Sequence, residues 1–172
     1  MNVFAPQIKI PATYMRGGTS KGVFFKLTDL PLAAQRPGAA RDALLLRVIG
    51  SPDPYEKQID GMGAATSSTS KTVILSKSER KDHDVDYLFG QVSIDKPFVD
   101  WSGNCGNLSA AVGPFAISNE LIVEGLVDGE VTEVIVDVMI RAQTKAMAMA
   151  QGEQCSPPAI SSTSLKSPAL AP

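Results

Sequence analysis

The chain has 172 residues, of which 44% are hydrophobic and 20% are charged. This length and composition are typical of one folded domain with its own core and exclude a disordered chain. A formal net charge of -2 argues against nucleic acid as the main partner, and no apolar run approaches the roughly 18 residues that span a bilayer.

The N-terminal part of the sequence predicts a hairpin followed by a helix. Residues 7–15 alternate in a strand-like way and residues 22–27 are apolar and aromatic, so two strands are expected, joined by a long glycine-containing loop. Residues 38–50 predict a short helix that ends at Gly50. The alternating positions of the first strand are Ile8, Ile10, Ala12 and Tyr14.

Three further strands are expected in the rest of the folded region. Residues 71–76 and 86–94 read as strands joined by a charged, solvated connection, in which His83 is expected on the surface. Residues 131–140 alternate clearly, with valine or isoleucine at every second position on one face. After residue 141 the sequence has few large apolar residues and gathers Ser, Ala and Pro, so residues 141–172 are expected to form a loose tail.

A cysteine lies in the turn "DWSGNCGN", residues 100–107, directly before an apolar segment. That segment predicts a helix from about Leu108 to Ile117, kinked at Pro114, and a helix that is apolar all round belongs inside a domain. Its start would open toward a cleft, bind an anion and favour the thiolate of Cys105. The residues alone are equally compatible with a buried structural cysteine in a tight turn.

Two other clusters have the composition of ligand-binding loops. "GMGAATSSTSK", residues 61–71, ends in Lys71 at the start of a strand, but it matches neither a P-loop nor a dinucleotide fingerprint. "MRGGTSKG", residues 15–22, places Arg16 and Lys21 across a turn, which suits a substrate with several carboxylates. The alternatives are a flexible surface loop with a solvated lysine and an ordinary hairpin loop.

The three motifs "YMRGGTSKGVFF", "SSTSK" and "DWSGNCGN", in this order and spacing, closely resemble the PrpF-type isomerases. That family includes 2-methylaconitate cis-trans isomerase, methylitaconate isomerase and 4-oxalomesaconate tautomerase, and it is similar in fold to diaminopimelate epimerase. The resemblance therefore implies an α+β lobe in which a curled, mostly antiparallel sheet surrounds a central apolar helix. It covers about residues 6–140, so residues 1–140 are expected to be the N-terminal lobe, with the family's second lobe absent.

The resemblance also implies the site residues. Lys71 and Cys105 match the candidate acid/base pair of the family. The residues expected along the substrate's carboxylates are Arg16, Thr19, Ser20, Lys21, Ser67, Asn104, Gly106 and Asn107.

The implied reaction moves a proton and a double bond in an unsaturated tricarboxylate or related dicarboxylate, and it requires no cofactor or metal. The alternatives are a lobe of such an enzyme that is inactive because it is incomplete, and a non-catalytic module, derived from such an enzyme, that binds carboxylates or a partner. The two cysteines do not form a disulfide framework, and the N-terminus lacks the features of a signal peptide, so a cytoplasmic protein is expected. The partners expected are a small polycarboxylate and, through exposed apolar surface, further copies of the chain. Neither nucleic acid nor membrane is expected.

Overall fold

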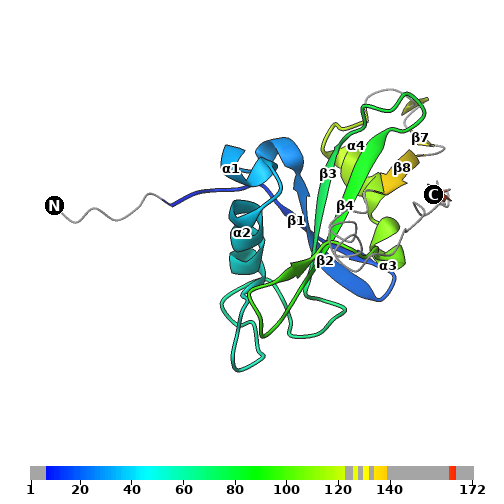
Figure 1. Ribbon diagram of the computed structural model, residues 1–172. Coiled ribbons are helices and arrows are strands. Elements are labelled where there is room, and N and C mark those ends of the chain that lie inside the picture. The colour runs from blue at the N-terminus through cyan, green and yellow to red at the C-terminus, as the bar shows by residue number, and fades with distance from the viewer. Residues whose placement is uncertain (1–6, 123–125, 128–129, 132–133, 139–162, 166–172) are drawn as a thin grey trace, which may run out of the picture.

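The computed structural model describes residues 7–122, 126–127, 130–131, 134–138 and 163–165. A sheet of seven strands forms its centre, with β5 pairing against β4 and the other strands in the order β1-β2-β3-β4-β8-β9 (Figure 1). Its strands are β1 (Thr13–Gly17), β2 (Ser20–Lys26), β3 (Lys71–Lys77), β4 (Val85–Val92), β5 (Val99–Asp100), β8 (Val134–Val138) and β9 (Thr163–Leu165). A separate pair consists of β6 (Leu126–Val127) and β7 (Glu130–Val131).

The large sheet is mixed and mostly antiparallel, as the resemblance implies. β1 with β2, β3 with β4, β4 with β5, and β8 with β9 pair antiparallel, whereas β2 with β3 and β4 with β8 pair parallel. A parallel pair needs a long crossover. Between β2 and β3 that crossover contains the helical segments η1 (Leu27–Asp29), α1 (Leu32–Gln35) and α2 (Ala39–Ile49).

Helices lie on both faces of the sheet, and the mostly antiparallel pairing of its strands makes the chain an α+β protein. In Figure 1, α1 and α2 lie on one side of the sheet, whereas α3 (Gly106–Ser109) and α4 (Val112–Ser118) lie on the other. In the described part of the chain no helix is both long enough and apolar enough to cross a membrane.

Each face of the sheet has its own hydrophobic core. Neighbouring residues of a strand point to opposite faces, so Phe24 and Phe25 of β2 enter different cores. The α2-side core comprises Val23, Phe25, Leu30, Ala34, Leu45, Leu46, Ile49, Ile74, Leu88, Val92, Val99 and Trp101. The α4-side core comprises Phe24, Val73, Leu75, Val85, Tyr87, Phe89, Cys105, Leu108, Ala111, Val112, Phe115 and Ala116.

The first hairpin is tighter than the sequence predicts. Gly17 pairs with Ser20, so only Gly18 and Thr19 form the turn, and Gly18 adopts a φ of +52° that glycine tolerates well. The first strand also begins later than expected, at Thr13. Tyr14 is exposed, and its neighbour Met15 packs against the α4-side core instead.

The helix after the cysteine turn differs most from its prediction. It consists of α3 and α4 with a break at Ala110 and Ala111, so Pro114 falls in the first turn of α4, where its missing N–H costs no helical hydrogen bond. The run of aligned peptide dipoles behind Cys105 is therefore shorter than expected. In the described structure the helix is not enclosed on all sides, because Asn107, Ala110, Pro114 and Ser118 are exposed.

The remaining predictions concern α2, the strands β3 and β4, His83 and the tail. α2 ends at Gly50 in the left-handed conformation (φ 87°), and β3 and β4 lie where they were expected. His83, expected on the surface, is instead buried in the β3–β4 connection, with Nδ1 2.9 Å from Oδ1 of Asp82. Of the expected tail, Thr163–Leu165 pairs with β8, and the remainder lies outside the described residues.

Candidate functional site

Cys105 lies at the residue before α3, and its backbone is fixed by three hydrogen bonds. Its carbonyl oxygen accepts from the Ser109 amide (3.1 Å), the Ser109 hydroxyl (3.2 Å) and the Tyr87 hydroxyl (3.2 Å). The residue is 8% exposed, and its thiol donates a weak hydrogen bond to Oγ of Ser20 (3.7 Å). Upstream, the indole N–H of Trp101 donates to Oδ1 of Asp42 in α2, which ties the turn to the far side of the sheet.

Tyr87 supports this turn from inside the α4-side core. Burial, and then the neighbouring charge of Cys105, raise the pKa of the Tyr87 hydroxyl above its ordinary value of 10.0. The folded state therefore favours the neutral phenol, which can donate to the Cys105 carbonyl.

Replacing Tyr87 with phenylalanine is expected to lower the free energy of unfolding by about 0.5–1.5 kcal/mol at neutral pH, because one hydrogen bond is lost while Ser109 still satisfies the carbonyl. Because the pKa of Tyr87 is raised, its contribution to wild-type stability is fully present below pH 10.0. That contribution is lost as the pH rises further, because the tyrosine ionises there more readily in the unfolded chain than in the folded one. The variant should lack this part of the alkaline decline. Urea unfolding at about pH 9 and about pH 11 measures both effects. Tyr14→Phe, at an exposed tyrosine, is the matched control and should change neither value.

The hairpin turn docks directly on the cysteine turn. A Cβ at Gly17 would collide with the Asn107 carbonyl oxygen and lie 2.9 Å from Cα of Leu108, so only glycine allows the approach. The Asn107 side-chain amide donates to Oγ1 of Thr19 (3.0 Å) and to Oγ of Ser20 (3.4 Å). The structure thus brings Thr19, Ser20, Cys105 and Asn107 together, as expected.

Lys71 begins β3 and faces the α4-side core, because it shares its strand face with Val73 and Leu75. The residue is only 9% exposed. Its Nζ donates to Oε1 of Gln91 at 2.6 Å and lies 4.9 Å from the centroid of the Phe89 ring. Lys71 and Cys105 therefore lie on the same side of the sheet, and Phe89 belongs to the same core as Cys105.

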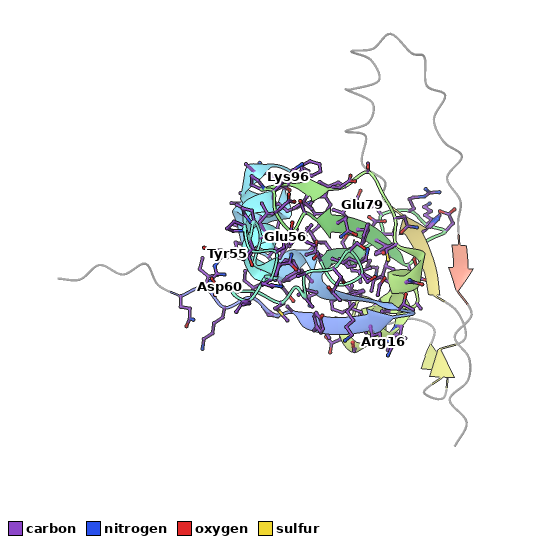
Figure 2. All side chains as sticks on the ribbon, turned by 90° about the horizontal axis from the view of Figure 1, so that it is seen from below. Arg16, Tyr55, Glu56, Asp60, Glu79 and Lys96 are labelled. Atoms are coloured by element: carbon purple, nitrogen blue, oxygen red, sulfur yellow. The ribbon has the colours of Figure 1, made fainter. Side chains whose placement is uncertain are left out.

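The structure does not bring Arg16 and Lys21 to this face. The two residues are partners in the β1–β2 register, and Lys21 follows Ser20 along β2, so its side chain leaves on the opposite face. Both are exposed, and Arg16 lies at the rim of the molecule near the hairpin turn (Figure 2), where its Nε donates to the Gly18 carbonyl at 2.9 Å.

Of the remaining expected residues, Ser67 and Asn104 lie on exposed loops, and Gly106 is the first residue of α3. Ser67 is exposed, and its neighbour Ser68 accepts a backbone hydrogen bond from Lys21 (2.9 Å), which holds this loop beside β2. Asn104 and Gly106 are also exposed. No atom lies within 4 Å of the position that a Cβ on Gly106 would occupy, so the backbone there is open to a ligand.

Gln58 fixes the loop before Lys71, although the sequence contains no signal that marks it. It is 1% exposed, its Nε2 donates to the Ser51 hydroxyl, and its Oε1 accepts from the Ala65 amide and the Ser70 hydroxyl. A buried amide with satisfied partners rigidifies its surroundings. The segment is therefore held in place at Lys71, unlike the flexible loop that its composition also allowed.

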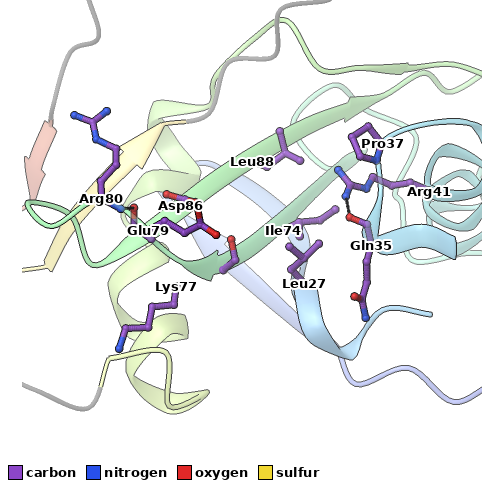
Figure 3. Close-up of a pocket in the computed structure, with 12 residues that line it drawn as sticks. Leu27, Gln35, Pro37, Arg41, Ile74, Lys77, Glu79, Arg80, Asp86 and Leu88 are labelled. Atoms are coloured by element: carbon purple, nitrogen blue, oxygen red, sulfur yellow. Dashed lines mark hydrogen bonds between the residues drawn. The ribbon is translucent and has the colours of Figure 1, made fainter. Parts of the chain in front are cut away.

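A hollow of about 540 Å³ lies on the other face of the sheet, between α1, α2 and the strands β3 and β4. Figure 3 shows Arg41 and Gln35 at its helical side, with Ile74 and Leu88 from the two strands beside them. Neither Lys71 nor Cys105 lines it. Within the described ranges, no group of three or more His, Cys, Asp or Glu could hold a metal ion.

Comparison with known proteins identifies similar chains. The family model described as PrpF protein matches residues 7–154. The chain is 87% identical over 117 residues to a 2-methyl-aconitate isomerase of Cupriavidus necator and 53% identical over 116 residues to a 4-oxalomesaconate tautomerase of Pseudomonas putida, covering 68% and 67% of this chain and 30% of each relative. The crystal structure of a methylitaconate-delta-isomerase is similar with a TM-score of 0.64 and 45% identity, over 76% of this chain and 31% of that one. The chain thus spans about 30% of the length of the curated relatives that it matches.

Proposed function

Because this chain belongs to the PrpF family, we propose that it supplies one side of the active site of a cofactor-independent isomerase. The substrate is an unsaturated tricarboxylate or a related dicarboxylate of the 2-methylaconitate or aconitate type. The names of the relatives support this substrate class. We also propose that the described sheet and its helices are the N-terminal lobe of a diaminopimelate epimerase-like fold.

The reaction is a proton shift. A base removes a proton from a carbon next to the conjugated acid, and the electron pair spreads into a dienolate-like intermediate. Protonation at another carbon moves the double bond, or protonation after rotation inverts its geometry. One proton leaves and one returns, so no oxidant or reductant takes part.

The observation that carries this proposal is the common face of Lys71 and Cys105. Both residues are mostly buried on the α4 side of the sheet, and an amine and a thiol can each exchange a proton with a carbon acid. Thr19, Ser20 and Asn107 lie around the thiol with hydroxyl and amide groups that can bind carboxylates.

Titrating the chain with trans-aconitate tests the proposal in two measurements. Calorimetry is expected to show binding, and the ultraviolet absorbance of the conjugated double bond is expected to change with time as isomerisation proceeds. Heat of binding without any absorbance change would support the non-catalytic carboxylate-binding module instead. The absence of both would contradict a carboxylate site on this chain.

A further inference from the structure

We propose that Gln91 is a positioning residue that holds the Lys71 ammonium group in place for proton transfer. The inference rests on the proposed function, which gives Lys71 its chemical role. Lys71 and Gln91 are direct cross-strand partners of β3 and β4, and Nζ donates to Oε1 at 2.6 Å. Hydrogen bonds from a charged donor are short and about twice as strong as neutral ones.

The orientation of the Gln91 amide is set by a second hydrogen bond. Its Nε2 donates to the carbonyl oxygen of Ser70 at 2.9 Å, so Oε1 must face Lys71. Ser70 is itself anchored, because its carbonyl also accepts from the Val92 amide and its hydroxyl donates to the buried Gln58. Lys71 is therefore held by a chain of contacts that begins in the preceding loop.

The charge of the acceptor matters as well as its position. In the described structure Lys71 makes no ion pair with a carboxylate. The titratable groups on its side of the sheet include Tyr87, Cys105, Asp100 and, at the exposed end of β3, Lys77. Asp100 is the cross-strand partner of Gln91 on β5, and its Oδ1 accepts hydrogen bonds from the amide and the hydroxyl of Ser102. A neutral amide fixes the ammonium without placing a negative charge against an anionic substrate, whereas a carboxylate in its place would repel that substrate.

The ring of Phe89 is the second group that contacts the ammonium of Lys71. Nζ lies 4.9 Å from its centroid, a distance at which the ring face attracts a cation. The ring and the amide both lie against the ammonium group of Lys71, but only the amide accepts a hydrogen bond from it. Removing the amide acceptor should therefore let the amine swing toward solvent, because the ring alone provides no directional partner.

Acylation of lysines by N-acetoxysuccinimide, read out peptide by peptide by mass spectrometry, tests this on the chain as it exists. Gln91→Met removes the acceptor with little change in volume, and it is expected to raise the labelling rate of Lys71 on the order of tenfold. Lys77, on the same strand and exposed, is the internal reference and should not change. Gln91→Glu keeps an acceptor oxygen and is expected to restore the protection of Lys71.

Gln35→Met removes a half-buried glutamine that donates to the Leu30 carbonyl on the other face of the sheet, and it is the matched control. It should leave the labelling of Lys71 unchanged. An unchanged Lys71 rate in Gln91→Met, or an equal rise at Lys71 and Lys77, would overturn the positioning role.

Turnover measurements test the proposed function separately from the positioning role of Gln91. If Gln91→Met frees Lys71 but Lys71→Ala turns over substrate normally, the positioning role stands and the catalytic assignment of Lys71 falls. If the positioning role of Gln91 and the catalytic role of Lys71 are both correct, Gln91→Met should lower kcat by about tenfold or more. KM should change little, because the displaced Lys71 amine acts in the chemical step.

Discussion

Replacing Lys71 with alanine is expected to slow the isomerisation of an unsaturated tricarboxylate by about 10²–10⁴-fold, the usual contribution of a positioned acid or base. Binding should weaken much less, because a group that moves a proton acts mainly in the transition state. Turnover is followed by the absorbance of the double bond and binding by calorimetry.

The matched control is Lys77→Ala, which removes a lysine from the other end of β3. Lys77→Ala should change turnover and binding by no more than severalfold. Thermal unfolding of both variants shows whether the loss of the buried lysine stem has altered the fold. Equal losses of binding and turnover in Lys71→Ala would indicate a carboxylate-binding lysine and contradict its acid/base role.

Cys105→Ser separates the two interpretations of the thiol within the same assay. A loss of turnover comparable with that of Lys71→Ala is expected if the thiol is the second acid/base. The serine hydroxyl can still contact Ser20, so a purely packing thiol would give a mild effect.

Replacing Gly17 with alanine is expected to lower the free energy of unfolding by about 1–3 kcal/mol and to separate the hairpin from the cysteine turn. The added Cβ would collide with the Asn107 carbonyl oxygen, which is backbone and cannot rotate away. The hydrogen bonds from Asn107 to Thr19 and Ser20 should break as a result, so ligand binding is expected to fall together with stability.

Gly103→Ala is the control for this substitution, because its added Cβ would meet nothing closer than the Phe89 ring at 4.0 Å. Urea unfolding and calorimetry on the two variants give the comparison. A Gly17→Ala variant as stable as Gly103→Ala would show that the two turns are not packed together as the structure has them.

Several elements of the fold follow from local patterns that the sequence carries on its own. The apolar runs of β3 and β4 predict their strands, and Gly50 predicts the end of α2, since it adopts the left-handed conformation that suits a helix terminus. Local chemistry is enough for these elements, because each signal lies within a few residues of its effect. The cluster of Thr19, Ser20, Asn107 and Cys105 is different, because its hydrogen bonds join residues 85 to 88 positions apart, and it is expected only from the resemblance to a family.

Other features depend on contacts between distant segments. Arg16 and Lys21 lie on the face of the hairpin opposite Cys105, because the two-residue turn fixes the register of β1 and β2. A register shift of one residue would move each side chain to the other face. The amide of Gln91 faces Lys71 only because β3 and β4 pair in one register and the Ser70 carbonyl occupies its other end. The exposed side of α3 and α4 depends in the same way on how the helices lie on the sheet. The sequence shows which residues carry groups able to exchange a proton, whereas strand pairing decides which of these residues share a face of the sheet.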